Sequence, residues 1–515
     1  GSNPRPLDYS LYRELITAHI WSAGLQPLGY QPVRGELMQK VGNKPYISVN
    51  YTFDGLTPAG LPEDLCYKLN QYYEQKLRQD KTAHDKIEFE IIFNTYDFMT
   101  DTRLKELAEY GFDDVEISQL RNALFEIAKQ TLEHYDEICE EDLRSLGQLT
   151  ELRHELRKHS PLAETNVMKL YSYIDELLDS IKDHGTPQFT RQARCAFMAR
   201  SFCRTLVEKG YFTKQEMDDF MLSIPTVASE FERDFDLYSH GKLSRDDFNH
   251  LYGHLRLGTY DIRSDSYRNI YFDVASANLT GNNKVKQEAK SLDLERLQVA
   301  LDEAGIPVTP EKFIEFIKKA TQNREYFKFE FTKSLSLMLD VIVKLGEVMA
   351  IAREDMSYLE IQDLLSYHSR DSYIQTIETR RRFYHVNSYL VLPEVIFDVG
   401  DIDVIDIDEA RPNFITNKVV EAPIVNLDED HDSDITGKIV ALTKADPGYD
   451  WIFAKDIAGF VTKYGGAASH MAIRCAEFGI PAAIGCGEKI YQRIHRMQIM
   501  CLDCENGRIT EKQSQ

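Results

Sequence analysis

The chain has 515 residues, of which 43% are hydrophobic and 28% are charged, and its formal net charge at pH 7 is −23. This length predicts two to four folding units, and the acidity excludes nucleic acid as a partner, because phosphate backbones bind basic surfaces. No uninterrupted apolar stretch approaches the roughly 20 residues that span a bilayer, so we expect no membrane partner.

The first residues and the cysteines predict a cytoplasmic location. The chain opens with Gly1-Ser2 and has no signal peptide. Its eight cysteines are scattered along a large chain without an export signal, which favours reduced thiols. Gly1-Ser2 resembles the remnant of a removed tag, so we expect the chain to be part of a longer protein.

Residues 1–395 are predicted to form a mainly helical domain. Apolar residues recur at helical spacing within the segments 120–138, 167–178 and 335–349. The segment 28–55 is richer in glycine, proline and β-branched residues, which favours a small sheet there.

The pattern changes after residue 395. The segment 396–407 alternates and is rich in Val, Ile and Asp, which predicts strands or an extended connector, and the whole connector is predicted over 396–436. Residues 437–515, or the longer segment from Pro412, are predicted to form a compact α/β domain, with strands over 437–443 and 457–462. The predicted fold class is therefore multidomain, with a large mainly α-helical domain followed by a compact α/β domain.

One Cys-x-x-Cys pair, Cys501 and Cys504, raises the question of a metal or redox site. The surrounding residues predict a strand that enters a turn at 505–507, and residues three apart on a strand point to opposite faces. No second pair completes a zinc site. We therefore predict ordinary strand cysteines and no bound metal.

The segment with the clearest chemistry is 465–485, which reads GGAASHMAIRCAEFGIPAAIG. A strand is predicted to end at Thr462, two glycines allow a sharp turn, and a helix begins near Ser469. His470 would then lie in the first helical turn, where free backbone N–H groups and the helix dipole favour an anion. Imidazole is nucleophilic near neutral pH, so His470 can accept a phosphoryl group that Ser469 helps to hold. A lone histidine at such a position more often has no chemical role.

This segment resembles the signature of the phosphoenolpyruvate-utilising enzymes, GGxxSHxAIxxxExGIPA. In that family the histidine carries a phosphoryl group between two distant active sites, and the resemblance implies this role for His470. It also implies a swivelling β/β/α domain, with Gly465 and Gly466 in the phosphate-binding loop. The chain departs from the family where Arg474 precedes Cys475, but an arginine four residues after the histidine shares its helical face and could still reach the phosphate.

The order of domains indicates which branch of the family the chain resembles. Members that process pyruvate place a barrel after the carrier domain, but only about 30 residues follow Gly485, too few for a barrel of about 250 residues. The arrangement is similar to the rifampicin phosphotransferase-like branch, in which an ATP-grasp domain and a helical acceptor domain precede the carrier. No segment resembles an ATP-grasp phosphate loop. We therefore expect ATP and Mg²⁺ to bind an ATP-grasp domain elsewhere in the full-length protein, with no cofactor tightly bound here and no ATP hydrolysis by this chain alone.

Two segments of the helical region resemble acceptor-site motifs of this branch. Residues 252–261, YGHLRLGTYD, are similar to the pattern GHRxPGExD, with a leucine in place of the proline. This resemblance implies substrate-binding roles for His254, Arg256 and Asp261.

The second segment is 324–328, REYFK, which resembles a segment that brings cations towards the phosphohistidine. Arg324 and Lys328 would share one helical face and clamp the transferring phosphoryl group. Glu325 is a candidate acceptor contact or base. A solvated basic helix face remains the alternative interpretation of this segment.

The likeness extends to a subgroup that includes L-glutamine kinase, through residues 5–15, 253–256 and 412–416. It implies an ATP-dependent phosphotransferase of the dikinase type, which forms AMP and phosphate while His470 passes a phosphoryl group to the side-chain amide of L-glutamine for capsule phosphoramidate biosynthesis. The alternatives are a rifampicin-phosphotransferase-like or phosphoenolpyruvate-synthase-like kinase with another small-molecule acceptor, or a non-catalytic phosphocarrier protein.

Overall fold

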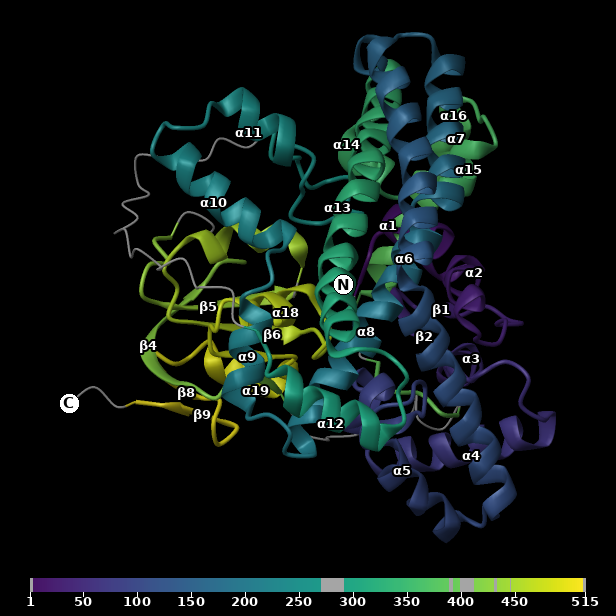
Figure 1. The fold of residues 1–515 in the computed structure, drawn as a ribbon. Coiled ribbons are helices and arrows are strands. Elements are labelled where there is room, and N and C mark those ends of the chain that lie inside the picture. The colour runs from purple at the N-terminus through teal and green to yellow at the C-terminus, as the bar shows by residue number, and fades with distance from the viewer. Residues whose placement is uncertain are drawn as a thin grey trace.

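The computed structural model describes residues 3–269, 291–388, 392–398, 412–429, 433–444 and 446–512. Helices make up most of the molecule, and the strands of the C-terminal part gather on one side of them (Figure 1). This arrangement of a large helical region followed by a strand-rich C-terminal region agrees with the predicted fold class. Below, residues 3–388 are called the helical region and residues 413–511 the sheet region.

Four long helices form the centre of the helical region: α6 (Asp114–Lys158), α7 (Val167–His184), α8 (Thr186–Glu208) and α13 (Pro310–Val348). The predicted apolar stripes lie in α6, α7 and α13, and α13 packs against the other three helices. Burial of these stripes accounts for most of their stability, because isolated helices are marginal in water.

Capping residues fix where the long helices begin. The Asp113 carboxylate accepts hydrogen bonds from the backbone N–H groups of Val115 and Glu116, and Glu116 returns a bond to the backbone N–H of Asp113. At the start of α13, Thr309 caps the helix and Pro310 occupies the first helical position, where no N–H is needed.

Shorter elements surround these four helices. The antiparallel strands β1 (Met38–Val41) and β2 (Lys44–Ile47) lie in the segment predicted to hold a small sheet. The shorter helices are α1 (Pro6–Tyr12), α2 (Ile20–Leu25), α3 (Val49–Leu56), α4 (Glu63–Gln79), α5 (Thr100–Arg103), α9 (Lys214–Leu222), α10 (Val227–Ser239), α11 (Arg245–Tyr252), α12 (Leu294–Ala304), α14 (Arg353–Met356), α15 (Ile361–Leu365) and α16 (Arg370–Asn387). Single turns of 3₁₀ or π helix include η1 (Arg13–Thr17), η2 (Gln26–Leu28), η3 (Lys81–Asp85), η4 (Ile87–Ile91), η5 (Leu104–Tyr110) and η6 (Pro161–Ala163).

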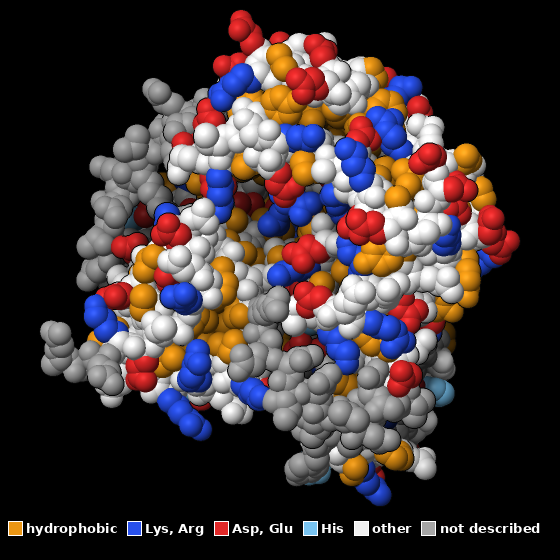
Figure 2. All heavy atoms as spheres, turned by 90° about the horizontal axis from the view of Figure 1, so that it is seen from below, with side chains coloured by type: hydrophobic (Ala, Val, Ile, Leu, Met, Phe, Trp, Pro, Cys, Tyr) orange, Lys and Arg blue, Asp and Glu red, His pale blue; other side chains and the backbone are white. Residues whose placement is uncertain are grey.

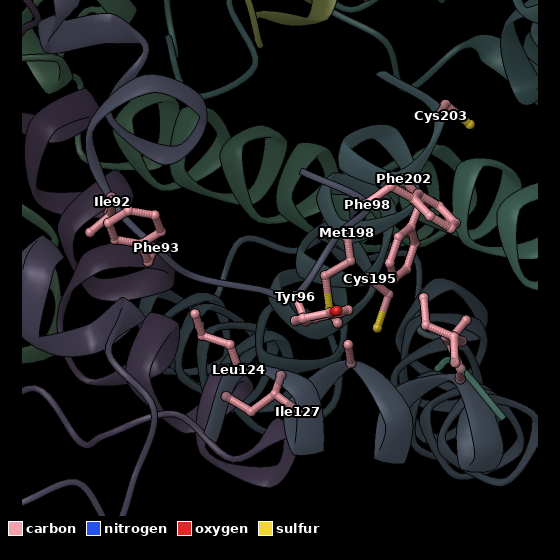
Figure 3. Close-up of a cluster of buried hydrophobic side chains, with 14 of the residues drawn as sticks. Ile92, Phe93, Tyr96, Phe98, Leu124, Ile127, Cys195, Met198, Phe202 and Cys203 are labelled. Carbon is pink, nitrogen blue, oxygen red and sulfur yellow. The ribbon is translucent and has the colours of Figure 1, made fainter. Parts of the chain in front are cut away.

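Two large apolar clusters fill the helical region. In the one drawn in Figure 3, Phe202 is fully buried, and its ring lies 5.2 Å from that of Phe313 and 6.0 Å from that of Phe98. The other cluster joins Leu7 of α1 to Tyr373 of α16. Each cluster therefore draws on segments that are far apart in the sequence.

The sheet region contains seven strands in the order β3-β7-β6-β5-β4-β8-β9. Strands β4 to β7 form a parallel core, and antiparallel strands extend it at both edges. The strands are β3 (Asn413–Ile415), β4 (Val419–Asn426), β5 (Ile439–Lys444), β6 (Gly459–Tyr464), β7 (Ala482–Ile484), β8 (Ile499–Asp503) and β9 (Arg508–Glu511). Apolar clusters cover both faces, which explains why β5 and β6 are buried along most of their length.

The sheet begins earlier than a connector over 396–436 would allow, close to Pro412, the earlier of the two predicted starts of the α/β domain. Strands β3 and β4 fall inside that segment and pair with β7, β5 and β8, so the sheet starts at Asn413. Residues 399–411, which include part of the predicted connector, lie outside the described residues.

An aromatic cluster joins the two regions. Helices α10 and α11 lie over the sheet region in Figure 1, and their aromatic side chains pack with Trp451 of the 3₁₀ segment η8 (Pro447–Ala454). The buried members of this cluster are Phe231, Phe235, Phe248, Tyr252 and Tyr267. Seen from below, Figure 2 shows a hollow where the sheet region meets the helical region, with lysine, arginine and carboxylate side chains around it.

The eight cysteines are all free thiols, with Cys501 in β8 and Cys504 just beyond that strand. Within the described ranges, no three His, Cys, Asp or Glu side chains are grouped so that they could hold a metal ion. None of the described helices combines the length and the apolar character that crossing a bilayer requires.

Candidate functional site

The segment that carries His470 turns sharply out of the sheet and enters a helix. Strand β6 ends at Tyr464, and Gly465 follows with a φ of 138°, a value that favours glycine. The Ser469 side chain accepts a hydrogen bond from the backbone N–H of Ala472, which makes Ser469 the N-cap of helix α18 (His470–Glu477). The predicted helix start is confirmed, with His470 as the first helical residue.

His470 lies between two carboxylates that belong to different regions. Its Nε2 is 2.7 Å from Oδ1 and 2.9 Å from Oδ2 of Asp450, in η8 of the sheet region. Its Nδ1 is 3.4 Å from Oε2 of Glu325, in α13 of the helical region. The ring is 9% exposed, so it is enclosed at the contact between the two regions.

The charges around His470 favour its protonated form. Burial lowers the pKa of His470, but the carboxylates of Asp450 and Glu325 outweigh burial and the opposing charge of Lys328, and the net pKa is raised above 6.5. Burial raises the pKa of Glu325 and of Asp450, yet His470 and the neighbouring cations hold both below their usual range. The two carboxylates therefore stabilise the imidazolium form of His470.

Arg474 is completely buried one turn after His470. Its Nε lies 3.4 Å from Oδ1 of Asp450, and its Nη1 donates a hydrogen bond of 3.2 Å to Glu477. The guanidinium stacks 4.7 Å over the ring of Phe478. Asp450 is thus shared between His470 and Arg474. Contact of Arg474 with a phosphate remains a prediction.

Arg324 and Lys328 lie on the same face of α13, towards the sheet region. Arg324 donates a hydrogen bond of 3.4 Å to the carbonyl oxygen of Ala468, in the loop before His470. Lys328 borders a cavity that also contains His470. Burial lowers the pKa of Lys328, while the carboxylate of Glu325 opposes that effect.

The loop that contains Gly465 and Gly466 lies against the helical region. A Cβ atom at Gly466 would lie 3.3 Å from Cβ of Asp85, the last residue of η3. Asp85 in turn accepts a hydrogen bond of 2.7 Å from the side chain of Asn413 in β3. The close approach of this loop explains a need for small residues, while its role in binding phosphate remains a prediction.

The cavity beside His470 is shared by both regions. Its walls mix apolar and polar side chains, as the walls of small-molecule sites do. Along α13, Glu325 contacts His470, Phe329 lies one turn later and contacts His254, and Ser336 lies further along and binds Arg256. The structure therefore brings four of the predicted helical-region residues, His254, Arg256, Glu325 and Lys328, to one cavity with His470.

His254 contributes an unpaired nitrogen to this cavity. The residue is 6% exposed, its ring lies edge-on to Phe329 at 4.6 Å, and its Nε2 has no hydrogen-bond partner among the described residues. Burial, with cations such as Lys333 and Arg153, lowers the pKa of His254 well below 6.5. His254 is therefore neutral and free to bind a polar group.

Arg256 borders the cavity but is held by the protein. Its Nε donates to Ser336 Oγ at 3.0 Å, its Nη1 donates to the Ser264 carbonyl oxygen at 2.7 Å, and its Nη2 pairs with Asp340. These bonds fix the segment around His254 against α13, which is a structural role.

Asp261 is not among the residues that line the cavity. Its backbone N–H donates to the Gly258 carbonyl oxygen, which closes a turn, and its carboxylate pairs with Arg263 at 2.7 Å. The structure does not bring Asp261 to the other predicted site residues, because this turn and ion pair hold it elsewhere.

Sequence reasoning missed Asp450, although the topology gives a signal for it. Strands β5 and β6 are parallel neighbours, and the loops that carry Asp450 and His470 both follow their carboxyl ends. Ligand sites of open α/β sheets gather at that edge. An acidic residue just after β5 is thus a natural partner for a histidine just after β6.

Comparison with known proteins agrees with this geometry. Residues 435–507, which include Asp450 and His470, match the family model of the PEP-utilising enzyme mobile domain. The chain is also similar to rifampicin phosphotransferase of Bacillus subtilis (strain 168), with 27% identity over 222 residues. Both matches support the family of PEP-utilising enzymes.

The match to rifampicin phosphotransferase covers 39% of this chain and 24% of the relative, so the chain spans about a quarter of the length of that curated relative. For a PEP-utilising enzyme mobile domain, a histidine at a helix start beside an acidic partner suits the chemistry of phosphoryl transfer.

Proposed function

We propose that His470 accepts a phosphoryl group at a donor site and delivers it to a small molecule in the cavity between the two regions. The observation that carries this proposal is that the His470 ring borders the same cavity as Lys328 and the unpaired His254. The acceptor that we propose is the side-chain amide of L-glutamine, as the resemblance to the L-glutamine kinase subgroup implies.

In the transfer step, the acceptor nitrogen attacks phosphorus, the bond between phosphorus and the His470 ring nitrogen breaks, and the ring takes the electron pair. The proton lost by the acceptor nitrogen ends on the ring. Asp450 and Glu325 favour this outcome, because they stabilise the imidazolium that forms. Lys328 and Arg324 neutralise charge on the transferring phosphoryl group.

The donor half of the reaction lies outside the described site. Under this proposal an ATP-grasp domain of the same full-length protein binds ATP and Mg²⁺ and phosphorylates His470, with AMP and phosphate as products. The sheet region then moves between that domain and α13. The contact between His470 and Glu325 supports α13 as the acceptor end of this movement.

Phosphoramidate phosphorylates histidine chemically, so it allows a test that does not depend on the ATP-grasp domain. Labelled phosphoramidate should place an acid-labile label on His470, and L-glutamine should remove the label and become phosphorylated. His470→Ala should abolish the label, whereas His495→Ala, a control histidine in the same region, should retain it. The carrier role would be overturned if His470 takes label neither from phosphoramidate nor from ATP in the presence of an added ATP-grasp domain. A stable label that neither glutamine nor rifampicin removes would overturn the acceptor site.

A further inference from the structure

Four basic residues from three segments lie around His254 and act on its charge. This cation cluster consists of Arg153 and Arg157 on α6, Arg268 in the loop after α11, and Lys333 on α13. In a chain with a net charge of −23, a local excess of positive charge calls for a specific explanation.

Direct contacts tie Lys333 and Arg153 to the surroundings of His254. The Lys333 ammonium lies 4.5 Å over the ring of Phe329, and that ring lies 4.6 Å from His254. Arg153 donates from Nη1 to the Glu330 carbonyl oxygen and to Ser334 Oγ, both at 3.1 Å. Lys333 is therefore one turn after Phe329 on α13, and Arg153 of α6 contacts the same part of α13 through Glu330 and Ser334.

Arg268 and Arg157 complete the cluster from two other elements. The Arg268 backbone N–H donates to the Gly253 carbonyl oxygen at 3.1 Å, which places Arg268 across from His254. Arg157 follows Arg153 by one turn on α6 and so shares its face. The charges of all four cluster members, together with burial, lower the pKa of His254.

The nearby carboxylates do not balance these cations. Glu330 pairs with both Arg153 and Lys333, and Asp340 is bound by Arg256. Within the part of the chain that the structure describes, Arg157 and Arg268 have no ion-pair partner. Two positive charges beside His254 thus lack a counter-charge.

We propose that an anionic group of the acceptor, a carboxylate, binds beside His254 in the cavity, accepts a hydrogen bond from His254 Nε2 and supplies the missing negative charge. This inference rests on the proposed function and specifies its substrate class. The acceptor has its reacting nitrogen at His470 and its carboxylate at His254.

The spacing along α13 fits such a molecule. Glu325 contacts His470 and Phe329 contacts His254, and the four residues between these two positions correspond to a rise of about 6 Å along the helix axis. In L-glutamine five bonds separate the amide nitrogen from the carboxylate carbon, which also spans about 6 Å. A free amino acid with an amide side chain therefore reaches both positions.

Calorimetric titration of the full chain tests the proposal with L-glutamine and with L-glutaminol, in which an alcohol replaces the carboxylate. We expect L-glutamine to bind more tightly by about tenfold or more, because its carboxylate is attracted by the half-buried Arg157 and the exposed Arg268 and accepts a hydrogen bond from His254. The double variant Arg157→Gln/Arg268→Gln should remove this preference. Arg144→Gln, at an exposed arginine on the same helix, should keep it.

A second variant guards against loss of folding. His254→Gln should also weaken the preference for L-glutamine, and thermal melting should show that each variant remains folded. Equal binding of the two compounds by the parent chain would overturn the inference, and so would a preference that survives in the double variant. Loss of label from His470 distinguishes this inference from the proposed function. If both compounds discharge the label equally, only the carboxylate site is contradicted. If neither compound discharges it, the transfer reaction itself is contradicted.

Discussion

The backbone of Gly448, in the sheet region, lies directly on the backbone of Leu257, in the helical region. A Cβ atom at Gly448 would lie 1.9 Å from Leu257 Cα and 2.1 Å from the Arg256 carbonyl oxygen, which no side chain can satisfy. The Tyr267 hydroxyl donates a hydrogen bond of 2.6 Å to the Gly448 carbonyl oxygen. Because η8 carries both Gly448 and Asp450, this contact sets the position of Asp450, and through it that of His470, against α13.

Gly448→Ala should separate the two regions without unfolding either one, because the added methyl group collides with backbone rather than with a movable side chain. We expect hydrogen exchange to increase in peptides covering 253–268 and 446–454, while phosphoramidate still labels His470. Gly437→Ala is the control, since its Cβ would meet no atom within 4 Å, although its positive φ costs about 1 kcal/mol. Unchanged exchange in Gly448→Ala would show that the contact is dispensable.

Asp450→Asn should lower the pKa of His470, because the neutral amide no longer stabilises the imidazolium. In the parent protein this pKa is raised, so the stabilisation by the ion pair is complete below pH 6.5 and is lost as the pH rises through the raised value. Melting temperatures of the parent should therefore fall over that range more than those of the variant. An NMR titration of the His470 ring measures the pKa directly, and an equal pKa in both proteins would contradict the assignment.

Arg474→Met should destabilise the sheet region by about 3–5 kcal/mol, because it leaves two carboxylates without their buried partner. Burial already raises the pKa of Glu477 to about 7 against the opposing charge of Arg474, so this carboxyl should become protonated in the variant. Thermal or urea unfolding measures the loss. Arg508→Met, at an exposed arginine of β9, should change stability little, and similar losses in the two variants would contradict the prediction.

Lys328→Met should slow transfer from His470 to the acceptor by about 10²-fold while leaving the labelling of His470 intact. The reason is that Lys328 is a half-buried cation near both Glu325 and Asp450, where charge moves during the transfer. Rates of label discharge with L-glutamine provide the measurement. Lys312→Met, on the exposed first turn of the same helix, is the matched control, and equal rates for the two variants would exclude this role.

Local parts of the site could be predicted from the sequence. The turn and the helix start at His470 follow from one contiguous segment, and the stripes in α6, α7 and α13 follow from helical periodicity. Arg324 and Lys328 share a face because that relation depends only on helix geometry. Each of these predictions requires no knowledge of how distant segments meet.

The remaining features depend on contacts between distant segments. Asp450 precedes His470 by 20 positions, and Tyr267 and Gly448 are 181 positions apart. The resemblance implied a binding role for Asp261, but a local turn and Arg263 hold its carboxylate away from the cavity. For strands β3 and β4 the sequence left two boundaries open, a connector up to residue 436 or a domain from Pro412, because short strands with few alternating residues give little signal until their partners are known.

The division of the cavity wall between the two regions has a thermodynamic consequence. Since His470 and Asp450 come from one region and His254 and Lys328 from the other, the complete cavity exists only while the regions are in contact. Any molecule that fills it must favour the closed arrangement, by about 2.7 kcal/mol at a hundredfold excess over its dissociation constant. Each substitution that lowers the fraction of molecules in the closed arrangement lowers the apparent affinity for that molecule in the same proportion.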